Sequence, residues 1–511
     1  MEKYLNQYLK ETGKTHYVPY ENPKLVVKDR TTLLDKQRGN VKIVDSIETA
    51  VKLSGLKDGM TISFHHHFRS GDRIVNMVLD VLEKMGFKDL RLASSSLSSV
   101  HSPVIDHIKS GLITRIETSG LRGELAEAVS HGIMKNPVIF RSHGSRANAI
   151  AEGNLKIDVA FLGAPSCDPF GNANGYTRDG VGKSMCGSMG YARIDAQYAN
   201  YVIVITDNIV SYPNVPFGIS QRYVNNIVVV DSIGDPDKIM SGATRFTTKP
   251  QDLLIAQRAA RVIVNSPYFY NGFSIQTGSG GASLAVIRFL AEDMRKNKIN
   301  ASFALGGITG QIVELYEEGL IKKILDVQSF DLTAANSLKN NHLHQQIDAD
   351  YYADPYKKGT AANMLDVVVL SALEVDVDFN VNVLTGSDGV IMGAIGGHQD
   401  TAAGSALSII VCPLLRGRIP SILKRVNTIV TPGSTVDVVV TDQGIAVNPA
   451  REDLIKCLTE NHISLVDIND LQKKAESIVG RPEKLPFGDK VVGEVTYRDG
   501  SIIDVIRNIE E

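Results

Sequence analysis

The segment between residues 374 and 399 combines polar side chains and glycines in an order that suits the stabilisation of negative charge. Acidic and amide residues alternate with apolar ones over 374–382, and a glycine-rich stretch follows at Gly393-Ala-Ile-Gly396-Gly397-His398-Gln399. Glycines let backbone N–H groups approach a ligand closely, and such groups bind the charge that develops on an oxygen during acyl transfer. An acidic turn followed by a structural glycine loop is the alternative, because glycine-rich loops have many uses.

A second glycine-rich stretch, Gln276-Thr-Gly278-Ser-Gly280-Gly281-Ala, lies between an expected strand and an expected helix over 283–294. The N–H groups of such a loop, together with the helix dipole, can bind a phosphate, a carboxylate or a thioester oxygen. The stretch matches neither the P-loop nor the dinucleotide-binding fingerprint. We therefore expect an anion or thioester site that includes Gln276, Gly278, Gly280 and Gly281.

A third candidate is the histidine-rich segment His65-His66-His67-Phe68-Arg69, which Arg73 follows near the start of an expected helix. Successive residues of an extended segment face opposite ways, so only His65 and His67 share a face. No third ligand with suitable spacing is visible, and we expect no metal site. The favoured interpretation is an anion site with His65, His67, Arg69 and Arg73, and a solvated polar loop is the alternative.

The elements that would position these residues are buried parallel strands. The apolar run over 365–370 is rich in β-branched residues, which is typical of a strand buried on both faces. In open α/β sheets, ligands bind outside the carboxyl ends of the strands, and residues 374–399 follow such an end. The polar cluster Ser142–Arg146 precedes another expected strand and is a second possible anion contact, or a polar loop.

The order of residue types around 365–383 occurs a second time at 157–175. Three pairs of residues are each 208 positions apart: Asp158 and Asp366, Asp168 and Asp376, Asn174 and Asn382. We infer a duplicated α/β unit, with each copy long enough for its own core. The predicted organisation is an N-terminal extension over 1–45, a first domain over 46–245 and a second over 246–511. We expect the charged tail from Pro482 at the periphery.

Composition excludes several classes of partner. The chain has 511 residues, 43% of them hydrophobic and 22% charged, with a net charge of −3. It lacks the basic segments that nucleic acid requires, so we expect no nucleic-acid partner. It has no apolar run long enough to span a bilayer and no secretory signal, and its four cysteines lack CxxC spacing. We expect a soluble, cytoplasmic protein with reduced thiols and no membrane partner.

Three stretches, FHHHFRSGD, SIQTGSGGASLAV and MGAIGGHQDTAAG, carry a resemblance to the α subunits of citrate lyase that extends over nearly the whole chain. More distantly, SALEVD at 371–376, Asn382 and Gly396-Gly397-His398-Gln399 resemble segments of the two-domain CoA-transferases. The resemblance implies two tandem, duplicated open α/β domains of the CoA-transferase type, with the active site between them.

The same resemblance implies a transferase that exchanges citrate for acetate on an acyl-carrier-protein thioester. Acetyl-S-carrier and citrate would give citryl-S-carrier and acetate. Citramalate could replace citrate in this reaction. The expected partners are the acyl carrier protein and lyase subunits in an oligomeric complex. The carrier would bring a phosphopantetheine-type group, and this chain would bind no cofactor tightly. The alternatives are a free CoA-transferase or acyl-CoA hydrolase, and a non-catalytic scaffold subunit.

Residue roles follow from the same comparison. Many CoA-transferases form a thioester on a glutamate, but the matching segment here, 303–310, contains no carboxylate. The implied route is direct attack of a citrate carboxylate on the acetyl thioester, for which the protein positions the reactants and stabilises oxyanions. The Asn382 amide and the N–H groups of Gly396 and Gly397 would form the oxyanion hole. The implied substrate-binding groups are Gln276, Gly278, Gly280, Gly281, His398 and Gln399, to which charge adds His65, His67, Arg69 and Arg73 for the tricarboxylate.

Overall fold

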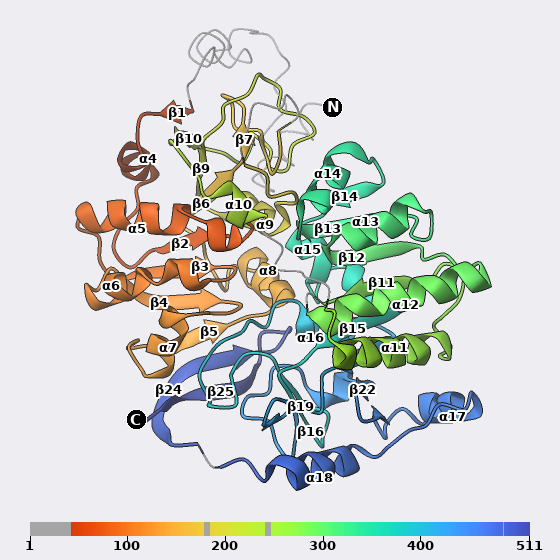
Figure 1. The fold of residues 1–511 in the computed structure, drawn as a ribbon. Coiled ribbons are helices and arrows are strands. Elements are labelled where there is room, and N and C mark those ends of the chain that lie inside the picture. Colours follow the sequence, from red (N-terminus) through yellow and green to blue (C-terminus); the bar gives the residue numbers. More distant parts are fainter. Residues whose placement is uncertain (1–41, 178–183, 241–246, 279, 484, 511) are drawn as a thin grey trace, which may run out of the picture. The chain divides into compact units, whose positions relative to one another are not determined.

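The computed structural model describes residues 42–177, 184–240, 247–278, 280–483 and 485–510 (Figure 1). Two large sheets, in which nearly all neighbouring strands are parallel, form its framework together with the helices that connect them. The predicted α/β class with parallel sheets is confirmed. Of the predicted N-terminal extension, only residues 42–45 are described, and Ile43 and Val44 form a short edge strand, β1.

The first sheet has ten strands, which are parallel except for the last pair. Their order is β1 (Ile43–Val44), β10 (Asn226–Val229), β9 (Tyr201–Thr206), β6 (Val159–Ala164), β2 (Thr61–Phe64), β3 (Leu90–Ser94), β4 (Ile113–Thr118), β5 (Val138–Phe140), β24 (Phe487–Thr496) and β25 (Ile502–Ile509). The accompanying helices are α4 (Ile47–Ser54), α5 (Ile74–Lys84), α6 (Val104–Lys109), α7 (Glu124–Ser130), α8 (His143–Ala151), α9 (Gly190–Tyr198) and α10 (Pro236–Ile239).

The second sheet has eight strands, again parallel except for the last pair. Their order is β14 (His344–Gln346), β13 (Ile324–Ser329), β12 (Phe303–Ile308), β11 (Ser274–Thr277), β15 (Val367–Ser371), β18 (Leu407–Val411), β22 (Val438–Val440) and β23 (Ile445–Val447). Its helices are α11 (Pro250–Val264), α12 (Gly281–Asn297), α13 (Gly310–Glu317), α14 (Leu332–Asn340), α15 (Ala349–Ala353), α16 (His398–Gly404), α17 (Glu452–Glu460) and α18 (Ile468–Val479). None of the described helices has the length and apolar character needed to cross a membrane.

Sequence patterns explain the central elements. Residues 367–370 of β15 are all buried, because this strand lies between β11 and β18 and helices cover the sheet. Helix α5 buries Ile74, Val78 and Leu82, which recur at helical spacing. Gly86 follows it with φ of 87°, a conformation that glycine adopts without strain.

The two halves contain matching turns after matching strands. Strand β6 is followed by β7 (Ser166–Cys167) and β8 (Ala173–Asn174), and β15 is followed by β16 (Glu374–Asp376) and β17 (Val381–Asn382). In the first turn Asp168 accepts a hydrogen bond from the side-chain amide of Asn172 at 2.8 Å, and in the second Asp376 accepts one from that of Asn380 at 3.2 Å. The turns are thus held by the same side chains, 208 residues apart.

The C-terminal tail is not peripheral, contrary to the sequence prediction. Strand β24 pairs with β5 in parallel, and β25 adds to it as the last strand of the first sheet (Figure 1). Val492, Val495 and Ile506 are buried there, so the apolar alternation outweighs the charged residues around it. The domain limits at 46–245 and 246–511 stay a prediction, and these last strands belong by hydrogen bonding to the first sheet.

Candidate active site

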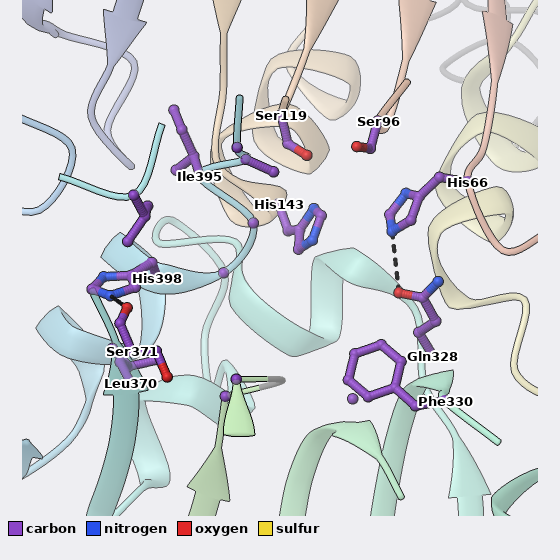
Figure 2. A pocket seen from close by; sticks show the side chains of 18 of the residues that line it. His66, Ser96, Ser119, His143, Gln328, Phe330, Leu370, Ser371, Ile395 and His398 are labelled. Carbon is purple, nitrogen blue, oxygen red and sulfur yellow. Dashed lines mark hydrogen bonds between the residues drawn. The ribbon is translucent and has the colours of Figure 1, made fainter. Parts of the chain in front are cut away.

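A cavity of about 480 Å³ lies where the carboxyl ends of strands from both sheets meet. His66, Ser96 and Ser119 follow β2, β3 and β4 of the first sheet and line one side, as Figure 2 shows. Leu370 and Ser371 at the end of β15, with Gln328 of β13, line the other. This is the edge at which open parallel sheets bind ligands.

Gly396 and Gly397 are a candidate anion site in this cavity. Gly396 has φ of 58°, in the left-handed region, and Gly397 has φ of −96° and ψ of 15°, and such successive conformations occur in backbone nests that bind anions. Neither N–H group donates a hydrogen bond to any residue that the structure describes. Both glycines line the cavity. We call Gly396 and Gly397 the glycine nest.

The start of α8 is fixed against the glycine nest by three hydrogen bonds. The His143 N–H donates to the Gly396 carbonyl at 2.9 Å. The Ser142 hydroxyl and the Gly144 N–H donate to the two carboxylate oxygens of Asp400 at 2.8 and 3.0 Å. Burial raises the pKa of Asp400 to about 6. Segments of both halves thus place the His143 ring next to the nest.

His143 belongs to a cluster of three aromatic rings. The ring centroids lie 4.2 Å apart for His143 and Tyr191, 4.9 Å for Tyr191 and His66, and 5.6 Å for His66 and His143. His66 Nε2 lies 3.1 Å from the side-chain oxygen of Gln328, the contact drawn in Figure 2. Burial lowers the pKa of His66 to about 3 and that of His143 well below its usual value. Both rings are therefore neutral groups that can donate one hydrogen bond.

The cavity has cations but no carboxylate in its described lining. Arg69 is partly committed, because its two terminal nitrogens donate to the backbone carbonyls of Ser329 and Phe330 and thereby join the two halves. Arg122 also lines the cavity, and its guanidinium has no hydrogen bond or ion pair with the residues described. The lining therefore suits an anionic ligand and offers no protein carboxylate as a nucleophile.

Of the predicted charged residues, Arg69 lies at the cavity, whereas three others do not. His65 and His67 do share a face, and their rings stack at 3.5 Å, but both are buried and hydrogen-bonded to the Gly163 backbone. The middle residue, His66, faces the cavity instead. Arg73 is exposed outside it. The structure therefore does not bring His65, His67 and Arg73 into the lining of this cavity.

Asn382 does not belong to the lining of the cavity. Its amide nitrogen donates to the Glu374 carboxylate at 2.9 Å and to the Thr385 carbonyl at 2.9 Å, and its oxygen accepts from the N–H groups of Leu384 and Thr385. These contacts leave no N–H for a substrate oxygen and argue against the predicted oxyanion role. Gln399 is likewise buried, with its amide donating to the Val430 and Thr496 carbonyls.

The remaining predicted residues line the cavity, with one exception. Gln276, Gly278, Gly280 and His398 do so, and Gly281, the first residue of α12, does not. The amide nitrogen of Gln276 donates to the Tyr352 hydroxyl at 2.9 Å. His398 is neutral, since burial lowers its pKa to about 4, and it lies 3.2 Å from the Ser371 carbonyl.

Comparison with known proteins decides the family. The sequence model of the family described as citrate lyase, alpha subunit (CitF), matches residues 40–509. The chain belongs to the citrate lyase alpha-subunit family. It is 55% identical to the citrate lyase alpha chain of Klebsiella pneumoniae, over 99% of this chain and 97% of that one. It is 58% identical to the alpha chain of Escherichia coli K12, over 92% and 91% of the two chains.

Solved structures agree with the family. A citrate lyase alpha subunit from Streptococcus mutans, in complex with citrate, superposes with a TM-score of 0.90 at 55% identity, covering 98% of this chain and 96% of that one. The malonate decarboxylase alpha subunit of Acinetobacter baumannii gives a TM-score of 0.63 at 14% identity, covering 89% and 91%. The second likeness shows a shared fold alone.

Sequence reasoning missed several lining residues of this citrate lyase family member. Arg122, Tyr191, Gln328 and Tyr352 come from four separate elements and stand in no motif. His143 belongs to the Ser142–Arg146 cluster, which the sequence did mark as a possible anion contact. Only the fold brings these side chains to one cavity.

Buried neutral histidines make the stability of this citrate lyase family member depend on pH. The pKa values of His66 and His67 fall to about 3, and those of His65, His143 and His398 are also lowered, in each case chiefly by burial. Below pH of about 6.5 the unfolded chain binds protons that the folded chain does not, so the free energy of unfolding should fall as the pH is lowered towards 4. Asp350 and Asp400, whose pKa values are raised to about 7 and 6, act in the opposite direction.

The contribution of one histidine can be measured by urea unfolding at several pH values between 4 and 7. His67→Gln should reduce the slope of the unfolding free energy against pH by about 1.4 kcal/mol per pH unit, the value for one proton. His342→Gln, at an exposed position, is the matched control. An unchanged slope in His67→Gln would show that folding does not lower the pKa of His67.

Proposed function

We propose that this chain catalyses the transfer of an acyl carrier between two acids: acetyl-S-carrier and citrate give citryl-S-carrier and acetate. Its family membership supports this activity, since its relatives are alpha chains of citrate lyase. Citrate as the acid is supported by the Streptococcus mutans relative, whose structure holds it. The carrier would be an acyl carrier protein, and a separate lyase subunit would cleave the citryl thioester.

The observation that carries the mechanism is the absence of any carboxylate from the described lining of the cavity, together with its cations and hydrogen-bond donors. An enzyme that forms an acyl anhydride on its own glutamate needs that side chain at the reacting carbon. Strand β12 and the residues after it, where CoA-transferases have their glutamate, contribute Gly307 to the cavity. The nucleophile is therefore the carboxylate of the substrate itself.

The proposed reaction has two acyl transfers. A citrate carboxylate oxygen attacks the acetyl carbonyl carbon, and the carrier thiolate leaves from the resulting tetrahedral intermediate, which gives a mixed anhydride of acetate and citrate. The thiolate then attacks the citryl carbonyl carbon, and acetate leaves with the bridging oxygen. Each tetrahedral intermediate bears a negative oxygen, for which the two free N–H groups of the glycine nest are available. The neutral His143 ring beside the nest can add a third donor.

The reacting thioester belongs to the carrier, which brings it into this cavity from outside. The proposed reaction therefore requires no cofactor bound by the chain itself. A phosphopantetheine-type arm on the carrier would deliver the acetyl group. Met392 lines the cavity and is 48% exposed, which supports apolar contact with such an arm at the entrance.

We also propose that the chain consists of two tandem domains of the CoA-transferase type, which arose by duplication. This proposal is supported by the strands β6, β7 and β8, whose counterparts β15, β16 and β17 lie 208 residues later. The matching Asp–Asn turns add a side-chain detail that unrelated sheets would not be expected to share.

Oxygen labelling in a single turnover tests the reaction. The purified chain, in molar excess, is mixed with acetyl-S-carrier and citrate labelled with 18O in its carboxylates, in unlabelled water. Direct attack transfers one citrate oxygen to acetate, so the released acetate should be two mass units heavier. An enzyme carboxylate as the nucleophile would give unlabelled acetate in this first turnover.

The alternatives give different results in the same experiment. A thioester hydrolase releases acetate without citrate and with an oxygen from water. A scaffold subunit binds the carrier and releases no acetate, whichever acceptor acid is added. Unlabelled acetate that requires citrate would overturn the direct route while preserving the transferase.

A further inference from the structure

We infer that Arg122 binds a carboxylate of the acceptor acid other than the one that reacts, so that the cavity selects acids with two or more carboxylates. This inference rests on the proposed function and assigns the recognition of its acid substrate. It starts from the electrostatics of the lining, where an uncommitted positive charge faces a cavity without described carboxylates.

Arg122 is the one arginine of the described lining whose guanidinium has no hydrogen bond with the residues described. Both terminal nitrogens of Arg69 are held by backbone carbonyls. His66, His143 and His398 are neutral, because burial lowers the pKa of each ring. Burial is also the cause that lowers the pKa of Arg122, and no neighbouring carboxylate offsets it. A guanidinium remains charged at neutral pH in such a setting, and its planar fork matches a carboxylate.

The backbone fixes Arg122 relative to the glycine nest. Residues 119–121 pair antiparallel with residues 393–395: the Ile395 N–H donates to the Ser119 carbonyl at 2.7 Å, and the Leu121 N–H to the Gly393 carbonyl at 3.2 Å. Arg122 follows the first of these segments directly, and the nest follows the second. The two anion-binding groups therefore stand at opposite ends of one short antiparallel ladder.

Two separate anion positions explain a preference for polycarboxylates. The glycine nest takes the oxygen on which charge develops, and it can serve any acyl transfer. Arg122 acts on a charge that is present throughout the reaction, so it contributes to binding and orientation of the acid. A monocarboxylate can react at the nest but has no second carboxylate for Arg122.

Two acceptor acids measured in the same variant separate these roles. Citrate transfer is compared with the exchange of labelled acetate into acetyl-S-carrier, in which acetate attacks the thioester and the thiolate returns to either carbonyl of the anhydride. In Arg122→Gln, the ratio of kcat/KM for citrate to that for acetate exchange should fall by about a hundredfold. Arg122→Lys, which keeps the charge and loses the fork, should give an intermediate ratio. Arg73→Gln, an exposed arginine outside the cavity, should keep the wild-type ratio.

Calorimetric titration of citrate, without any carrier, makes the inference independent of turnover. Arg122→Gln should weaken citrate binding by at least about tenfold, and Arg73→Gln should not. Wild-type citrate affinity in Arg122→Gln, or an equal loss of citrate transfer and acetate exchange, would overturn the role of Arg122. A wild-type chain that binds citrate through Arg122 but performs neither reaction would instead refute the proposed transferase and leave Arg122 as the citrate-binding group.

Discussion

Gly397→Ala is expected to lower citrate-dependent release of acetate by about a hundredfold while the chain remains folded. The loss of a single oxyanion donor typically has this magnitude. Gly397 has φ of −96°, which alanine also adopts, so the substitution causes no backbone strain. Its effect arises from the space that a methyl group would need.

That space is occupied by Tyr352. A Cβ atom on Gly397 would overlap the Tyr352 hydroxyl oxygen and lie 3.2 Å from two carbons of its ring. Tyr352 is 2% exposed and is held by the hydrogen bond from Gln276, so it cannot turn away. The backbone at residue 397 must shift instead, and the shift moves its N–H away from the oxyanion.

A double variant tests this explanation. Tyr352→Phe removes the atom nearest to the added methyl group, so Gly397→Ala in that background should recover at least about tenfold of the lost rate. Tyr352→Phe alone is the control for the missing hydroxyl. Circular dichroism, which does not depend on tryptophan and suits a chain that has none, verifies the fold of each variant. Wild-type transfer in Gly397→Ala would exclude the glycine nest as the oxyanion hole.

The histidine segment shows how far the sequence could predict the site. Alternation identified His65 and His67 as a pair on one face, and the structure confirms that they stack. Strand β2 is buried along its whole length, and His65 and His67 after it are buried as well. A sequence pattern cannot tell which enclosed face borders a cavity, and His66 occupies it.

Asn382 shows a second limit of sequence reasoning. Its place in the turn after a strand was predicted, and β17 confirms it. Whether its amide nitrogen is free to bind a ligand depends on tertiary neighbours. Here that nitrogen donates hydrogen bonds to Glu374 and Thr385. The glycines at 396 and 397 were easier to predict, because backbone N–H groups in a glycine loop depend less on neighbouring side chains. Arg122 gave no signal, since a lone arginine after a strand has many uses.

Asp195→Ala is expected to lower the free energy of unfolding by about 3–5 kcal/mol, because it leaves a buried guanidinium without its counter-ion. Arg146 donates to both oxygens of Asp195 at 2.7 and 2.9 Å, and the two residues are 4% and 0% exposed. The pair joins α8 to α9, and a further bond from Arg146 to the Ala93 carbonyl joins both helices to β3. These helices carry His143 and Tyr191, so the same change should also loosen the cavity.

Urea unfolding followed by circular dichroism measures this stability, and two further variants isolate its cause. Glu48→Ala removes one partner of the exposed Lys52–Glu48 pair and should change stability by no more than about 0.5 kcal/mol. Arg146→Met combined with Asp195→Ala removes both buried charges and should recover most of the loss, since an apolar replacement of a whole buried pair is often neutral. If the double variant were as unstable as Asp195→Ala alone, the loss would come from packing between α8 and α9, and the unpaired guanidinium would not be its source.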